Sequence, residues 1–264
     1  MKIDNDIREW VSIITPTYHS AKMLNDTMKS IIEQSNKKFE WIVVAGDESG
    51  ETKNVLARYS GTDLLVLQRP PKGIYDAVKT GFDAAKYQII YWINAGDILM
   101  PYAIDAVLRE ASDRKFKWWT GSASLRNEDV QLIRVDPRND YHSNCIKLGF
   151  YGKHMPWLQQ ESIFFRREML EDVDMERFSK FRFAGDYFLF HSFNKNGIQL
   201  KSLGYMIASF TRHEGQVSEN QVMYWKEVES FAGSYSTNII THPFSFLLSI
   251  NLLLKFLYKR MWPN

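Results

Sequence analysis

Short apolar segments alternate with segments of helical periodicity in the first part of the chain. Four apolar segments are rich in β-branched residues and have the length of buried strands. They are residues 11–15, 39–44, 64–67 and 89–93. Apolar residues recur every three or four positions in the segments that follow them, which predicts helices at 21–34, 52–59, 74–85 and 101–111. This alternation predicts an α/β fold with a mostly parallel central sheet flanked by helices.

The pattern is less regular after residue 117. It predicts further strands, two helices and one long loop. The strands are 118–120, 130–135, 198–203 and 207–210, the helices are 162–170 and 184–196, and the loop is 139–160. No internal repeat interrupts the chain, which has the length of one large domain or of a domain with an appended subdomain.

Polar or turn-forming residues follow each of the first four predicted strands. These turns are residues 15–18, 46–49, 70–73 and 94–97. Right-handed crossovers place the carboxyl ends of parallel strands along one edge of a sheet, so the four turns should converge there. Ligands of open α/β sheets bind beyond this edge, and we therefore expect a site where the turns meet.

The turn at residues 94–97 is the most informative of the four. It reads Asn-Ala-Gly-Asp and follows an apolar strand directly. The carboxylate of Asp97, on a turn with a glycine, is suited to a metal ion or to a complex of metal and diphosphate. Asn and Asp are also good turn formers, so the pattern alone leaves a purely structural turn open.

Composition and motifs exclude several classes of protein. The net charge of +2 provides no global electrostatic reason to bind nucleic acid. The single cysteine, Cys145, excludes an intramolecular disulfide and a cysteine-built zinc site, which fits a reducing cytosol. No GxGxxG or GxxxxGK[ST] motif follows the first strand, which argues against a Rossmann dinucleotide site and a P-loop.

The two ends of the chain suggest where the protein resides. Residues 1–10 are polar and charged, unlike a signal peptide, so we expect a cytoplasmic protein. Residues 244–258 are strongly apolar, and Lys259, Arg260 and Trp262 follow them. This segment predicts an apolar helix shorter than the roughly 20 residues that span a bilayer. Either residues 244–262 lie in the interface at the inner face of the membrane, or the helix packs on the body or on a second subunit.

Six segments resemble, in order, the motifs of family 2 glycosyltransferases, which have the GT-A fold. The segment KGIYDA is similar to a family motif of the same letters, and WINAGD to the "LNAGD" form of the metal-binding motif. The others are similar to the opening strand, the acceptor segment, the segment of the catalytic base and a late F-R-x-H-x-G-x-x-S motif. The six are residues 11–18, 72–77, 92–97, 160–167, 184–187 and 210–218.

The resemblance implies an inverting sugar transfer from a nucleotide-diphosphate sugar to a hydroxyl of a glycan or lipid-linked acceptor, in cell-surface polysaccharide biosynthesis. It divides the chain into a nucleotide-sugar half at 1–115, an acceptor-binding and catalytic half at 116–220, and a helical extension at 221–264. It also implies a divalent cation, Mg²⁺ or Mn²⁺. We expect contact with a membrane only through residues 244–262 of the extension.

The resemblance also assigns roles to particular residues. Asp186 matches the general base, although a carboxylate at this position can also cap a helix. Asp97 matches the metal ligand. Trp157 and Gln160 fall on the acceptor side, where Trp157 stacks on a sugar or fills the core. The donor side receives Thr15, Pro16, Tyr18, Asp47, Lys72, Asp76, Asn94 and Arg212. For Asp47, Lys72 and Arg212, a plain surface or loop role is the alternative.

The chain departs from the family pattern at several acidic positions. Asn94 and Gly96 stand where acidic residues are common, and Ala45 and Gly46 stand where an Asp contacts the base, with Asp47 following. These departures motivate an alternative function, a non-catalytic nucleotide-sugar or glycan-binding partner of a polysaccharide assembly complex. A sugar nucleotidyltransferase is a third hypothesis, but its Gly-rich basic first loop is absent.

Overall fold

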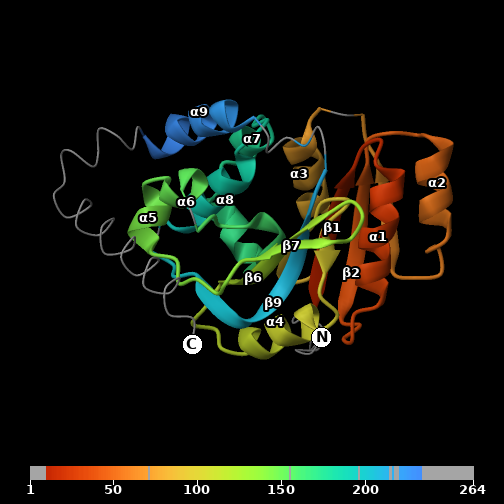
Figure 1. Cartoon of the computed structure of the whole chain (residues 1–264), viewed down its shortest axis with the longest axis horizontal. Helices are drawn as coiled ribbons and strands as arrows, with labels where there is room; N and C mark the ends of the chain where they lie inside the picture. The colour runs from red at the N-terminus through yellow and green to blue at the C-terminus, as the bar shows by residue number, and fades with distance from the viewer. Residues whose placement is uncertain are drawn as a thin grey trace, which may run out of the picture.

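The structure is a computed structural model, shown in Figure 1. It describes residues 10–70, 72–154, 156–195, 197–213, 216 and 220–233 of the 264 residues. The apolar segment 244–262 and much of the predicted late motif, residues 214–215 and 217–218, lie outside the described residues.

The first half of the chain forms the alternating α/β arrangement that the hydrophobic pattern predicts. Its strands are β1 (Val11–Thr17), β2 (Phe39–Ala45), β3 (Leu64–Gln68), β4 (Ile89–Trp92) and β5 (Ile98–Leu99). Its helices are α1 (Ala21–Ile32), α2 (Gly50–Ala57), α3 (Ile74–Ala84) and α4 (Ala103–Ala111). β1 pairs in parallel with β2 and β4, and β2 pairs in parallel with β3. The expected parallel sheet is therefore confirmed in this half.

The second half extends the same sheet with strands of mixed direction. Its strands are β6 (Trp118–Asn127), β7 (Leu132–Val135), β8 (Ile163–Arg166) and β9 (Lys201–Arg212). Its helices are α5 (Ser143–Lys147), α6 (Phe150–Lys153), α7 (Met175–Phe178), α8 (Gly185–Phe193) and α9 (Gln221–Ala232), with 3-10 turns η2 (Gln160–Ser162) and η3 (Arg167–Asp172). The strand order is β3-β2-β1-β4-β8-β6-β9-β5, and β7 pairs with β6.

Four predicted elements of the second half are wrong: one helix, two strands and one loop. The predicted helix at 162–170 is instead β8 followed by η3, because all four residues of β8 are buried between antiparallel partners, β4 and β6. The two predicted strands at 198–203 and 207–210 are one strand, β9. The predicted loop at 139–160 contains α5 and α6. Periodicity cannot separate a short buried strand from a helix, and here the pairing of β8 decides the structure.

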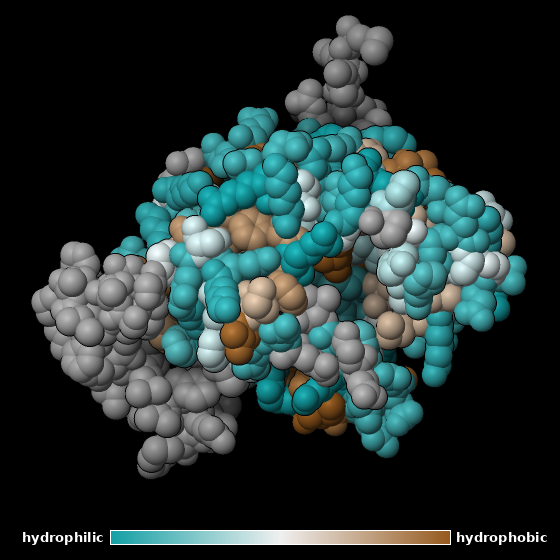
Figure 2. All heavy atoms as spheres, turned by 90° about the horizontal axis from the view of Figure 1, so that it is seen from above, coloured by the Kyte–Doolittle hydropathy of each residue, from teal (hydrophilic) through white to brown (hydrophobic). Residues whose placement is uncertain are grey.

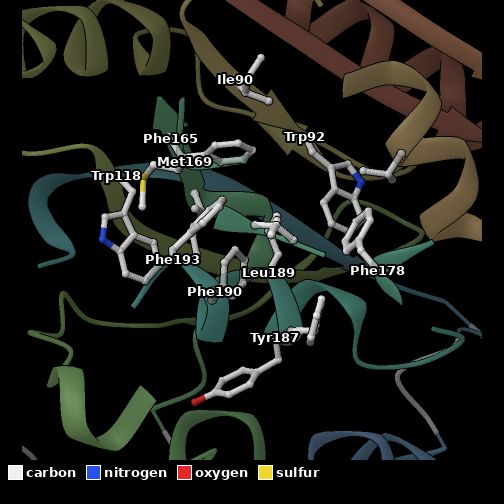
Figure 3. Close-up of a cluster of buried hydrophobic side chains, with 14 of the residues drawn as sticks. Ile90, Trp92, Trp118, Phe165, Met169, Phe178, Tyr187, Leu189, Phe190 and Phe193 are labelled. Carbon is white, nitrogen blue, oxygen red and sulfur yellow. The ribbon is translucent and has the colours of Figure 1, made fainter. Parts of the chain in front are cut away.

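The sheet lies between two hydrophobic cores. The side chains of each central strand alternate between them, as Ile13 and Ile14 of β1 do. One core packs the strands against α1 and α4, and the other packs them against α3, α7 and α8. Figure 3 shows Trp92 of β4 and Phe178 of α7 in the second core, with Leu189 and Phe190 of α8. α8 is buried almost all round, so its first turn is held rigidly against the sheet.

Hydrophilic residues cover most of the face shown in Figure 2, and hydrophobic residues appear there in small separate patches. Within the described ranges, every helix is too short or too polar to cross a bilayer.

Candidate active site

The turns after β1, β2 and β3 meet through hydrogen bonds. The backbone N–H of His19, after β1, donates to Asp47 Oδ1 at 3.0 Å. The backbone N–H of Arg69, after β3, donates to the carbonyl oxygen of Ala45 at 3.0 Å. The expected convergence of these turns at one sheet edge is confirmed.

Asp47 ties the turns together. Ser49 Oγ and Thr52 Oγ1 donate to its Oδ2 at 2.6 Å and 2.9 Å, in addition to the bond from His19. Burial acts to raise the pKa of Asp47, but these hydrogen bonds outweigh it and lower the pKa to about 2. The carboxylate is therefore permanently charged near neutral pH and already engaged by the protein.

The other donor-side residues differ in exposure. Thr15 is fully buried, and its Oγ1 accepts a hydrogen bond from Trp41 Nε1 at 3.2 Å. Pro16 is also buried, because β1 extends to Thr17. Tyr18 is 55% exposed, and Lys72 is exposed. Asp76 forms a two-point ion pair with Arg69, with N–O distances of 3.0 and 3.3 Å.

The turn after β4 is hydrogen-bonded to η2, which was predicted on the acceptor side. Asn94 Oδ1 accepts a hydrogen bond from Trp92 Nε1 at 2.8 Å, and Asn94 Nδ2 donates to Gln160 Oε1 at 3.1 Å. Gln160 Nε2 donates in turn to the carbonyl oxygen of Trp92 at 2.5 Å. Asn94 and Gln160, predicted on opposite sides of the site, therefore form one hydrogen-bonded unit.

Asp97 ends the same turn and is only 3% exposed. Its Oδ1 accepts the backbone N–H of Thr211, in β9, at 3.0 Å. Burial raises the pKa of Asp97 to about 7, against the opposing effects of the Thr211 N–H and of Arg126. Arg212, the residue after Thr211, is exposed at the end of β9.

The backbone of this turn is fixed by residues that the sequence analysis did not single out. Gly96 has a φ of 112°, a region that favours glycine. Its carbonyl oxygen accepts hydrogen bonds from Thr211 Oγ1 at 2.5 Å and from Arg126 Nη2 at 3.1 Å. Thr27 Oγ1 accepts from the Gly96 N–H and donates to the carbonyl oxygen of Asp97, both at 2.8 Å. Of the three side chains that fix this turn, those of Thr27, Arg126 and Thr211, only Thr211 belongs to a predicted motif, the late motif at 210–218.

Asp186 lies in the first turn of α8 and is half-buried. Its Oδ1 accepts the N–H of Tyr187 at 2.8 Å and the hydroxyl of Tyr75 at 3.4 Å. Burial raises the pKa of Asp186 to about 6, against the opposing effects of these hydrogen bonds.

Tyr75 of α3 also fixes the chain that leads to Asp186. Its hydroxyl donates to the carbonyl oxygen of Phe183 at 2.7 Å. A Cβ on Gly185 would lie 2.6 Å from Cδ1 of the Tyr75 ring, so this close approach requires a glycine. Tyr75 belongs to the predicted KGIYDA segment, but only the structure shows its contact with Asp186.

Glu161 is a third acidic residue in this region that sequence reasoning missed. It lies in η2, beside Gln160, and is 5% exposed. Burial and the negative charge of Asp97 raise the pKa of Glu161 to about 8, with further contributions from Asp186 and Asp136. The acidic residues of the turn after β4, of η2 and of α8 therefore interact electrostatically across one region.

Trp157, predicted on the acceptor side, lines a groove. It is 41% exposed, so the alternative that it fills the core is wrong. The guanidinium carbon of Arg134 lies 5.9 Å from the centroid of its ring, and Tyr141 donates a hydrogen bond to its carbonyl oxygen at 2.8 Å. The groove around it also includes Asp136 and Gln159.

The possible metal ligands at Asp97 suit a cation that binds together with the diphosphate of the sugar donor. In the part of the chain that the structure describes, no group of three or more His, Cys, Asp or Glu side chains could hold a metal. Mg²⁺, however, is commonly held by one or two carboxylates together with phosphate oxygens and water. Asp97 can supply one carboxylate of this kind.

A model of glycosyl transferase family 2 matches residues 12–173, and the chain belongs to this family. The match ends before Asp186, so the family assignment rests on the part of the chain from β1 to β8. The sheet order and the helical layers described above are those of the GT-A fold, to which the solved structures below also belong.

Several curated proteins resemble parts of the chain. A PGL/p-HBAD biosynthesis glycosyltransferase of Mycobacterium bovis BCG is 33% identical over 104 residues, which cover 38% of this chain and 40% of that protein. The poly(ribitol-phosphate) β-N-acetylglucosaminyltransferase TarP of Staphylococcus aureus is 26% identical over 100 residues, 36% of this chain and 31% of TarP. The chain matches about half or less of the length of such relatives.

Two solved structures illustrate the shared fold. S. aureus TarS 1-349 in complex with UDP-GlcNAc has a TM-score of 0.62 at 15% identity, over 80% of this chain and 61% of that chain. The mannosyltransferase PcManGT of Pyrobaculum calidifontis, in complex with GDP-Man and Mn²⁺, has a TM-score of 0.56 at 14% identity, over 92% of this chain and 79% of that chain. At these identities the likeness establishes the fold alone.

Proposed function

We propose that the protein is an inverting glycosyltransferase that moves a sugar from a nucleotide-diphosphate sugar to a hydroxyl of a glycan or lipid-linked acceptor, in polysaccharide-related biosynthesis. The environment of Asp186 is the observation that carries the proposal. Its carboxylate is half-buried, and one oxygen accepts hydrogen bonds from Tyr75 and Tyr187. Burial raises its pKa to about 6. A base with this pKa is largely ionised at neutral pH and still able to accept a proton.

In the proposed reaction, the acceptor hydroxyl oxygen attacks the anomeric carbon from the face opposite the diphosphate. A new C–O bond forms there while the bond from the anomeric carbon to the diphosphate oxygen breaks. The nucleoside diphosphate leaves with the electron pair of that bond, and the carboxylate of Asp186 accepts the hydroxyl proton. One displacement of this kind inverts the anomeric centre.

The convergence of the turns after β1, β2 and β3 supports donor binding at this edge of the sheet, and we place the turn after β4 on the same side. We assign residues 1–115 to donor binding and 116–220 to acceptor binding and catalysis. Within the donor half, Tyr18 and Lys72 are exposed and available to a ligand, whereas Asp47 and Asp76 shape the site through their bonds within the protein. A divalent cation bound at Asp97 with the diphosphate would stabilise the negative charge of the leaving group.

Nucleotide release is the direct test, with UDP-GlcNAc and GDP-mannose as donors, Mn²⁺ or Mg²⁺ present, and a panel of glycan and lipid-linked acceptors. Asp186→Asn keeps the size of the side chain but removes the base, and we expect turnover to fall at least about 100-fold. Asp172→Asn, in η3, is a matched control. Full activity in folded Asp186→Asn and Asp97→Ala proteins would refute the proposal.

A non-catalytic sugar-binding protein is the competing function, and the departures at Asn94 and Gly96 motivate it. The same assay separates the two. Calorimetric binding of a nucleotide diphosphate, without turnover on any acceptor of the panel, would favour the competing function.

We further propose that the enzyme acts in the cytoplasm, at the inner face of the membrane, through residues 244–262. The basis is the sequence of that segment, which combines apolar residues with a basic, Trp-bearing end. A chain truncated after Thr241 should lose binding to anionic vesicles that the full chain retains. Equal binding by both chains would exclude an anchor in this segment.

A further inference from the structure

Helix α9 lies across the amino-terminal end of α8, where Asp186 is located (Figure 1). It presents Glu227 to the segment 182–184 that precedes the base. Glu227 Oε1 accepts the backbone N–H of Arg182 at 3.0 Å. Its Oε2 accepts those of Phe183 at 2.9 Å and Ala184 at 2.7 Å. One carboxylate therefore binds three consecutive backbone donors just before the helix begins.

We infer that Glu227 is a positioning residue for the general base, acting through the backbone of residues 182–184. The inference rests on the proposed role of Asp186. Nothing in the matched family segment, residues 12–173, includes α9 or Glu227.

The geometry explains how a residue that makes no contact with substrate can orient the base. The N–H groups at the beginning of a helix have no partner within the helix, and hydrogen bonds from them to a carboxylate are the strong, charge-assisted kind. Tyr75 holds the opposite side of the same segment, because its hydroxyl donates to the carbonyl oxygen of Phe183 at 2.7 Å. The segment is thus clamped between α3 and α9, and Asp186 follows it by two residues.

α9 is itself anchored, so the clamp rests on a fixed support. Val228 is fully buried in the core that contains α8. Arg177 of α7 donates a hydrogen bond to the carbonyl oxygen of Ser230 at 3.1 Å. Glu229 of the same helix forms its ion pair with Lys153 of α6, away from residues 182–184, so Glu229→Gln removes a negative charge from α9 and leaves the three hydrogen bonds of Glu227 in place.

Glu227 also affects the charge around the base. The titratable groups that interact with Asp186 are Tyr75 from α3, Tyr224 and Glu227 from α9, and Glu161 from η2. Burial is the main cause of the raised pKa of Asp186, and the negative charge of Glu227 raises it further. Neutralising Glu227 should therefore lower the pKa of Asp186.

The test compares Glu227→Gln with Glu229→Gln in the full chain. A glutamine keeps the size and one acceptor oxygen, but it removes the negative charge and places an N–H₂ group where the second oxygen accepts, so at least one of the three hydrogen bonds is lost and the others are no longer charge-assisted. In Glu227→Gln we expect faster amide hydrogen exchange in a peptide covering 182–186 and a lower pKa for Asp186 by carboxyl ¹³C NMR. Neither should change in Glu229→Gln. Both measurements are independent of any substrate.

Turnover completes the test, with the donor and acceptor found by nucleotide release. We expect kcat of Glu227→Gln to fall about tenfold or more with little change in KM for the donor, and Glu227→Asp to recover part of it. Unchanged exchange and unchanged pKa in Glu227→Gln would overturn the inference, as would a wild-type kcat despite those changes. If Asp186→Asn is itself fully active, the proposed function fails first, and the exchange data still report whether the clamp exists.

Discussion

At the scale of single residues, the environment decides what each carboxylate can do. Asp47 accepts hydrogen bonds from both sides of its turn, which lower its pKa to about 2 and keep it charged. Asp186 is short of such bonds, and burial raises its pKa to about 6. An aspartate therefore serves as a permanently charged structural residue at position 47, and its environment at position 186 suits it to accept a proton.

The pH dependence of turnover should reflect the raised pKa of Asp186. The base must be ionised to accept a proton, so kcat at saturating donor and cation should fall about tenfold per pH unit below about 6. An ordinary aspartate would place this limb near pH 4. A pH–rate profile of nucleotide release is the measurement, and an acid limb near 4 would contradict an acid-base role for Asp186 in this environment.

At the scale of elements, one buried carboxylate connects the ends of β1 and β2 to the start of α2. Asp47 binds the backbone of His19 and the side chains of Ser49 and Thr52, and Ser49 is the N-cap of α2. The turns after β1 and β2 are consequently held by a side chain for which the sequence suggested either contact with the base of the nucleotide or a plain loop role. In β8, by contrast, the surrounding elements decide the local structure. The sequence of β8 also suits a helix, but its pairing with β4 on one side and β6 on the other makes it a strand.

Asp47→Asn should destabilise the protein in a pH-dependent way. The pKa of Asp47 is lower in the folded chain than in the unfolded chain, so its charge contributes stability above about pH 4 that is lost as pH falls toward 2. A lowering from 3.8 to about 2 corresponds to roughly 2 kcal/mol at neutral pH. Urea unfolding at pH 7 and at pH 3 measures it, with the exposed Glu48→Gln as control. An equal loss at both pH values would show that the charge of Asp47 is not the cause.

At the scale of the whole molecule, long-range contacts assemble the site from both halves of one sheet. Asp97 is bonded to Thr211, which is 114 residues away in sequence, and Asp186 to Tyr75, 111 residues away. Asn94 and Gln160 join the same two halves through their side chains. A ligand that spans the turns should therefore stabilise the entire domain.

Binding of donor and cation should appear as thermal stabilisation. UDP or GDP together with Mn²⁺ should raise the Tm, because a ligand at 100 times its Kd adds about 2.7 kcal/mol to the free energy of unfolding. Asp97→Ala should retain the nucleotide effect but lose the additional effect of Mn²⁺, whereas Asp113→Asn, at an exposed position, should behave as the wild type. Differential scanning fluorimetry is the measurement, and an undiminished Mn²⁺ effect in Asp97→Ala would place the cation elsewhere.

The sequence by itself determined the alternating first half, the convergence of its polar turns and the family of the chain, because strand and helix periodicities are local properties and the motifs stand in order. Only the tertiary structure decided that Ile163–Arg166 is a strand, that Asp47 is an internal tie, and that Glu161, Tyr75 and Glu227 surround the two predicted acids. The physical reason is that these roles depend on burial and on partners far away in sequence, which no local pattern encodes.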